Sequence, residues 1–214
     1  MEAKQIEIKA LFICLAAVVS IEAITRMVIS AGLRYPMIIL GGARLLEIGL
    51  IILCVLIWGK GFPSIGLARS RIVPGLGKGL MWSAGFAVVT FLAFLILFVA
   101  GIDALKLIKV HLPANYGEII PFFLVGGLVG PIAEEIFFRG MLYGFFRRWG
   151  VLVALVLSTL MFVLPHVAFS KIPIVQVVGG IVFAVAYEIE ESLMVPITIH
   201  VLGNLAIFTL SMMS

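Results

Sequence analysis

The sequence predicts an all-α fold, a polytopic membrane helix bundle of about seven transmembrane helices, and two observations support this prediction. Hydrophobic residues make up 63% of the 214 positions and charged residues only 12%, and the mean hydropathy is +1.27. Because soluble domains are about 45–50% apolar and roughly 25% charged, a soluble core could not bury this much apolar surface. The apolar residues also form runs of about 20, the length that a helix needs to span the hydrocarbon core.

Seven apolar runs of spanning length follow one another along the chain, at residues 10–31, 36–58, 80–102, 119–146, 150–169, 173–188 and 193–212. Helices satisfy their backbone hydrogen bonds internally, as lipid requires, and no alternating barrel-strand pattern competes with this interpretation. The first run carries Glu22 and Arg26 and lacks a small-residue cleavage signature, so we interpret it as a retained helix rather than a signal peptide. The expected location is integral and multi-pass, in a prokaryotic inner membrane.

Two polar stretches separate groups of these runs. The longer one, Lys60 to Lys78, contains two prolines, several glycines and four cations, and this composition predicts a surface loop. The other, Lys106 to Glu118, divides the bundle into two parts. We therefore expect residues 1–110 to form the first three transmembrane helices and residues 111–214 to form a second unit from the remaining helices.

The charge and the cysteines exclude other classes of protein. The net charge is +4 and the sequence pI is about 9.3, but the basic residues gather at the ends of apolar runs, as they do in membrane proteins. The expected partner is therefore the lipid bilayer and not a nucleic acid. Cys14 and Cys54 both lie inside apolar runs, where free cysteine behaves as a small hydrophobe, so no disulfide framework is predicted.

One set of charged residues lies inside the first two runs. Glu22 with Arg26 and Arg44 with Glu47 are spaced by four and three residues, which places opposite charges on one face of a helix. Pairing lowers the cost of burying charge in the bilayer. We interpret these residues as structural ion pairs or as a clasp between the two helices, and a substrate-contacting role is the alternative.

A second set lies in the later runs and lacks matching cations: Glu134, Glu135, Arg139, His166, His200 and Asn204. Glu135 and Arg139 are four residues apart, in the favourable order for a helical salt bridge. Glu134 is rotated about 100° from Glu135 and is left without that partner, as suits a general base. His200 precedes Asn204 by one helical turn, so both side chains face the same way. These are groups that carry out acid–base chemistry.

The spacing of these residues resembles three motifs of one family. Glu134 to Arg139 is similar to EExxxR, Phe162 to His166 to FxxxH, and His200 to Asn204 to HxxxN. Each motif alone is weak, but three in this order on apolar helices are specific. Together they resemble the CPBP family of intramembrane proteases, which includes type II CAAX prenyl proteases and bacteriocin-processing or Abi proteins. The resemblance covers roughly residues 119–210, within the unit 111–214 that would form the catalytic core.

The resemblance implies a helix bundle that encloses a polar, water-filled cavity. It also implies an endopeptidase that hydrolyses a peptide bond of a membrane-associated protein or peptide substrate. Glu134 and His166 would activate a water molecule, and His200 with Asn204 would stabilise the oxyanion. Glu135 and Arg139 would be structural support. These roles agree with the chemistry of the residues, since glutamate is a suitable base and histidine and asparagine are suitable donors.

Three alternatives remain open at this point. Glu134, His166 and His200 could together bind zinc, although the HExxH spacing is absent. We favour a site without a cofactor, because zinc-binding histidines usually have orienting partners and Asn204 and Glu135 already have other uses. A non-catalytic membrane scaffold or bacteriocin-immunity protein of the same family is the second alternative. A transporter is the third, but the sequence shows no paired halves.

Overall fold

The computed structural model describes residues 6–32, 34–167 and 173–213, and within these ranges the chain is helical and contains no strand. The all-α prediction is confirmed. Five helical segments are long and apolar enough to cross a membrane: Ile8–Ser30, Pro36–Trp58, Phe62–Val99, Tyr116–Trp149 and Met194–Met213. A shorter apolar helix, Val151–His166, adds to them. The protein is therefore an integral, multi-pass membrane protein.

Each of the seven predicted runs coincides with a helical segment. The main helices are α1 (Ile8–Ser30), α2 (Pro36–Trp58), α3 (Arg69–Val99), α8 (Val151–Val163), α9 (Ile174–Glu190) and α10 (Met194–Met213). The remaining run is a nearly continuous helix from α5 (Tyr116–Leu124) to α7 (Gly144–Phe146), called here the central helix. The fifth predicted run, 150–169, includes α8 and the short 3₁₀ turn η5 (Leu164–His166) that follows it. Its residues 168 and 169 lie outside the described residues.

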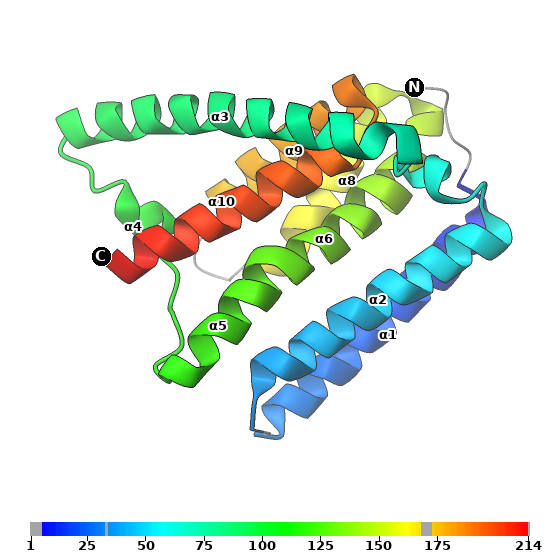
Figure 1. Cartoon of the computed structure of the whole chain (residues 1–214), viewed down its shortest axis with the longest axis horizontal. Coiled ribbons are helices and arrows are strands. Elements are labelled where there is room, and N and C mark those ends of the chain that lie inside the picture. Colours follow the sequence, from blue (N-terminus) through cyan, green and yellow to red (C-terminus); the bar gives the residue numbers. More distant parts are fainter. Residues whose placement is uncertain (1–5, 33, 168–172, 214) are drawn as a thin grey trace.

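The central helix is surrounded by the others. It contacts α2 on one side, α8 on another and α10 on a third, while α1 packs against α2 and α3 lies along α10. Figure 1 shows α1 and α2 as a pair beside the central helix, with α3 crossing the far end of the bundle. The central helix thus lies between α2, from the first part of the chain, and α8 and α10, from the second part.

The loop prediction for residues 60–78 is only partly correct. A 3₁₀ turn η1 (Phe62–Ile65) lies in this stretch, but α3 already begins at Arg69, eleven residues before the predicted run. The reason is packing against distant residues. A Cβ atom on Gly75 would lie 2.2 Å from Ser192 Oγ, and one on Gly79 would lie 2.6 Å from Thr198 Cβ. Glycine here permits close approach to the start of α10, where sequence alone favours a flexible loop.

The central helix contains two π-helical segments, which the sequence did not predict. These segments, η2 (Val125–Val129) and η3 (Ile136–Tyr143), lie on either side of the short helix α6 (Gly130–Glu135). A π segment shifts the register of backbone hydrogen bonds and often marks a functional site in a longer helix. Glu134 and Glu135 are the last two residues of α6, so both carboxylates lie where the π segment η3 begins.

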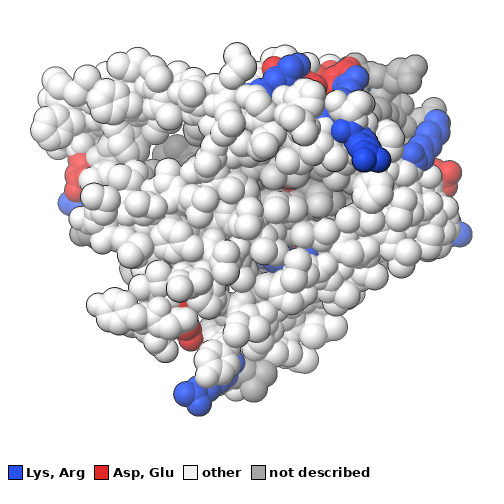
Figure 2. All heavy atoms as spheres, in the orientation of Figure 1, with Lys and Arg blue, Asp and Glu red and all other residues white. Residues whose placement is uncertain are grey.

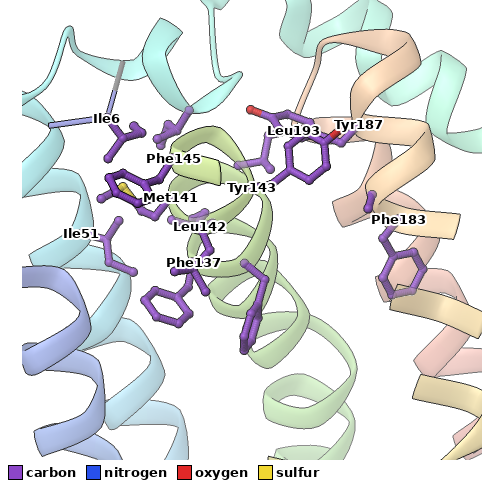
Figure 3. Close-up of a cluster of buried hydrophobic side chains, with 14 of the residues drawn as sticks. Ile6, Ile51, Phe137, Met141, Leu142, Tyr143, Phe145, Phe183, Tyr187 and Leu193 are labelled. Atoms are coloured by element: carbon purple, nitrogen blue, oxygen red, sulfur yellow. The ribbon is translucent and has the colours of Figure 1, made fainter. Parts of the chain in front are cut away.

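The hydrophobic core surrounds η3. Figure 3 shows Met141, Leu142 and Tyr143 between Ile6 and Ile51 on one side and Leu193 and Tyr187 on the other. Charged residues are sparse on the visible surface and gather mainly at the end where α3 begins (Figure 2). Three ion pairs near that end join different helices or their ends: Arg71–Glu191, Lys78–Glu190 and Arg147–Glu188.

Candidate active site

The Glu134 side chain lines a cavity inside the bundle. The cavity has a volume of about 580 Å³ and is lined by residues of α1, α2, the central helix and the end of α8, including Glu134 and His166. The Glu134 side chain is 20% exposed. It makes no hydrogen bond within the described part of the chain, in contrast to its neighbour Glu135. The predicted carboxylate without a tight partner is therefore present, and it faces a space of the size that binds small ligands or peptide side chains.

Glu135 and Arg139 form the predicted ion pair, fully buried. Arg139 Nη1 donates to Glu135 Oε1 at 3.0 Å and Arg139 Nη2 donates to the carbonyl oxygen of Gly180 at 3.0 Å. The guanidinium carbon lies 4.5 Å from the ring centre of Phe162 and 5.3 Å from that of Phe183. Arg139 is thus held by a carboxylate, a carbonyl and two aromatic faces, so it ties the central helix to α8 and α9.

Glu135 also orients His200, and sequence reasoning missed this contact. Its Oε1 atom accepts the bond from Arg139 and lies 2.8 Å from His200 Nδ1. The imidazole stacks on Phe183 with ring centres 4.7 Å apart, and His200 Nε2 lies 3.8 Å from Glu134 Oε2. A carboxylate oxygen has two lone pairs and can accept from both partners. The adjacent glutamates therefore approach the two nitrogens of one histidine ring.

His166 lines the same cavity as Glu134. It is the last residue of η5, is exposed, and its Nδ1 atom is 2.9 Å from the carbonyl oxygen of Phe162. Because a carbonyl only accepts, Nδ1 carries the hydrogen and neutral His166 presents Nε2 as an acceptor. Phe162 thus contributes its ring to Arg139 and its carbonyl to His166. No hydrogen bond joins His166 to Glu134 within the described residues, and the cavity is what they share.

Asn204 faces the central helix, as does His200, so the shared direction predicted from their spacing is present. Its side-chain nitrogen donates to the carbonyl oxygen of Gly126 at 2.9 Å. Gly126 belongs to the π segment η2, where the altered backbone register changes which carbonyls are paired. One of the two amide hydrogens of Asn204 is therefore used within the protein.

The charged residues of α1 and α2 line the same cavity as Glu134. Glu22, Arg26, Arg44 and Glu47 are all part of its wall. Arg44 pairs with Glu47 on its own helix at 2.8 Å and with Glu22 on the neighbouring helix. The predicted Glu22–Arg26 pair is loose, at 3.9 Å. The dominant contact is therefore the clasp between α1 and α2, which sequence spacing alone could not distinguish from two separate pairs.

A metal ion does not fit the described arrangement directly. No three histidine, cysteine, aspartate or glutamate side chains converge to hold an ion within the described residues. One argument from the sequence is nevertheless wrong, namely that the histidines lack orienting partners. Glu135 orients His200, and the Phe162 carbonyl orients His166. The sequence did not predict these contacts, because one carboxylate oxygen can accept from two donors and a backbone acceptor is not part of a motif.

A second, more open groove lies between α3 and α9, with a volume of about 790 Å³. Its only charged lining residues are Lys78 and Glu190, which pair with each other. Of the acid–base groups that the sequence singled out, Glu134 and His166 line the smaller cavity, and His200 lies next to Glu134 without lining it. We treat this cavity as the candidate site.

These features define a class of protein: a polytopic helix bundle with an ionisable cluster and a cavity inside the membrane. Residues 116–206 match the family model described as "Type II CAAX prenyl endopeptidase Rce1-like". The membrane-embedded CAAX protease MroQ of Staphylococcus aureus (strain USA300) is 36% identical over 93 residues, which is 40% of this chain and 37% of MroQ. No solved structure matches the chain significantly.

The matched segment contains all three motifs, from Glu134 to Asn204. Residues 116–206 are therefore similar to the type II CAAX prenyl endopeptidase family, and the resemblance inferred from the motifs is confirmed. The chain spans little more than a third of the length of the relative MroQ.

Proposed function

We propose that the protein is an intramembrane endopeptidase that hydrolyses a peptide bond of a membrane-associated protein or peptide. The observation that supports this most directly is the placement of Glu134. Its carboxylate has no hydrogen-bond partner among the described residues, faces the cavity, and lies 3.8 Å from His200 Nε2. A half-buried carboxylate in such a place is suited to take a proton from water beside a bound substrate.

In the proposed first step, Glu134 removes a proton from a water molecule while the oxygen attacks the substrate carbonyl carbon. His166 supports this step because its Nδ1 hydrogen is donated to Phe162, which leaves Nε2 free to accept a hydrogen bond from the same water. The carbon–oxygen bond forms as the carbonyl π bond opens, and the negative charge moves to the carbonyl oxygen. The proton on Glu134 then passes to the amide nitrogen, and the carbon–nitrogen bond breaks.

His200 is proposed to stabilise the oxyanion, and its contacts define the form that it must take. Glu135 occupies Nδ1 as an acceptor, so Nε2 can donate only when both ring nitrogens carry hydrogen. In that imidazolium form, the cluster of Glu134, Glu135, Arg139 and His200 contains two negative and two positive charges. The cluster is then neutral, which lowers the cost of keeping it in a low-dielectric interior.

Removing either proposed oxyanion donor should slow the chemical step. We expect His200→Ala and Asn204→Ala each to lower kcat on the order of 100-fold or more, with a much smaller change in KM. The measurement is initial-rate kinetics of purified variants on a cleavable peptide. Leu202→Ala on the same helix is the matched control, because Leu202 is exposed on α10 and should leave both constants near the wild-type values. If both substitutions raise KM and leave kcat unchanged, these residues bind substrate only in the ground state.

Activity is expected to survive removal of metal ions. Protein purified in detergent and dialysed against a strong chelator should retain its cleavage rate, because the proposed steps use only the carboxylate, the imidazoles and the amide. Elemental mass spectrometry of the same sample should show less than stoichiometric zinc. Stoichiometric zinc, with activity that chelation removes and added zinc restores, would instead make Glu134, His166 and His200 its ligands.

The proposed function is tested with a library of membrane-spanning peptides in detergent micelles, with the products identified by mass spectrometry. The wild-type protein should generate new peptide termini, and the His166→Ala variant should generate far fewer. If purified, folded wild-type protein leaves every peptide intact and also leaves the proteins of its own membrane intact, the non-catalytic scaffold or immunity role replaces the protease.

A further inference from the structure

The cavity has a second polar wall that the proposed reaction does not use. It consists of Glu22 on α1 and Arg44 and Glu47 on α2. Arg44 and Glu47 line the same cavity as Glu134. Whatever occupies the cavity next to Glu134 must therefore also meet this wall.

The less exposed part of this wall holds fewer positive charges than negative charges. Arg44 is the less exposed of the two arginines in this cavity lining, with a side chain 19% exposed, and it pairs with both Glu22 and Glu47. Arg26 lies 3.9 Å from Glu22 and its side chain is 73% exposed, so this solvent-exposed pair contributes little. Two carboxylates therefore share the half-buried guanidinium of Arg44.

Glu47 carries the clearest sign of an unmet partner. Its side chain is only 3% exposed, and Arg44 bonds to Oε2. The other oxygen, Oε1, is buried and has no hydrogen-bond partner among the described residues. A buried carboxylate oxygen without a donor is costly, on general grounds, unless another molecule supplies that donor.

We propose that Glu47, with Glu22 and held in place by Arg44, forms a subsite that binds a basic side chain of the substrate beside the scissile bond. This inference rests on the proposed function and names the substrate feature that the site selects. A substrate carboxylate does not fit here, because it would enter between two carboxylates that already share Arg44. A lysine side chain does fit, since the apolar lining from Leu15, Val18 and Phe137 suits its methylene stem. The carboxylates of Glu22 and Glu47 suit its ammonium group.

The test uses a pair of apolar peptides of about 20 residues, long enough to span a bilayer, that differ only in the acetylation of one lysine. Both carry a single central lysine, and in one peptide this lysine is acetylated, which removes its charge. For the wild-type protein, kcat/KM should be on the order of 30-fold or more higher for the lysine peptide, as is typical when a buried charge pair is lost. In Glu47→Gln this ratio should fall to near one.

Two further variants complete the cleavage experiment. Glu22→Gln should also reduce the ratio, and it replaces Glu47→Gln if that variant does not fold. Glu190→Gln is the matched control, because Glu190 pairs with Lys78 on another helix but lies outside the cavity. It should keep the wild-type ratio. A ratio near one in the wild-type protein, or a high ratio that persists in both Glu47→Gln and Glu22→Gln, would overturn the proposed subsite.

A binding measurement separates this inference from the proposed function. Calorimetric titration of the Glu134→Gln protein should show the lysine peptide binding on the order of 30-fold more tightly than its acetylated form. The difference should disappear in the Glu134→Gln, Glu47→Gln double variant. If the wild-type protein cleaves neither peptide, the proposed function fails, and the binding difference alone then supports or overturns the subsite.

Discussion

The Glu134→Gln variant should lose peptide hydrolysis while remaining folded and inserted in the membrane. Glutamine keeps the shape of the side chain but cannot accept the proton of the attacking water, so the rate should fall on the order of 1000-fold, within the range for losing a general base. Folding should be preserved, because Glu134 makes no hydrogen bond to any described residue and only a 3.8 Å contact with His200. The measurement is kcat/KM on a cleavable peptide, with thermal unfolding in detergent recorded on the same preparation.

Glu118→Gln is the matched control for this experiment, since it makes the same change in the first turn of α5, outside the cavity. It should retain wild-type activity. A Glu134→Gln variant that cleaves near the wild-type rate would remove Glu134 from the reaction, whatever happens at the histidines.

The Arg139→Ala variant should instead lose the folded protein. The substitution would leave Glu135 buried with His200 as its remaining partner and would remove the contacts with Gly180, Phe162 and Phe183. Breaking one side of a buried ion pair typically costs about 3–5 kcal/mol, which is a large part of the total stability of an ordinary domain. We expect a much smaller monomer peak in size-exclusion chromatography and a lower unfolding temperature.

Two further variants sharpen this result. Arg139→Lys keeps the charge, but an ammonium group cannot reproduce the planar contacts with Glu135, Gly180 and the rings, so its stability should be intermediate. Arg69→Ala removes an exposed arginine at the start of α3 and should behave as the wild type. If Arg139→Ala yields wild-type amounts of protein with an unchanged unfolding temperature but no activity, Arg139 acts in the reaction and not in the fold.

The sequence predicted the helices well because a membrane span is a local property. The run predicted at residues 36–58 is α2, residue for residue, and the run at 193–212 differs from α10 by one residue at each end. The start of α3 was missed because Gly75 and Gly79 are explained only by contacts with Ser192 and Thr198. Contacts between residues more than 100 positions apart are not contained in any local pattern.

The candidate site shows the same division between features set by local spacing and contacts between distant residues. The Glu135–Arg139 pair follows from helical spacing and is present. The bond from Glu135 to His200 joins positions 65 residues apart, and the clasp of Arg44 with Glu22 depends on how α1 and α2 pack. The π segments on either side of α6 also depend on tertiary packing. The catalytic roles assigned to Glu134, His166, His200 and Asn204 stay predictions.

The sharing of one Glu135 oxygen between Arg139 and His200 has a consequence for how this architecture can decay. A substitution of Glu135 that frees His200 also strips the buried guanidinium of its counter-ion, so the chain loses its structure together with its chemistry. Glu134 and His166 are under no such double constraint. A descendant that gave up hydrolysis and survived as an inert membrane protein would therefore be expected to change at Glu134 or His166 while keeping Glu135 and Arg139.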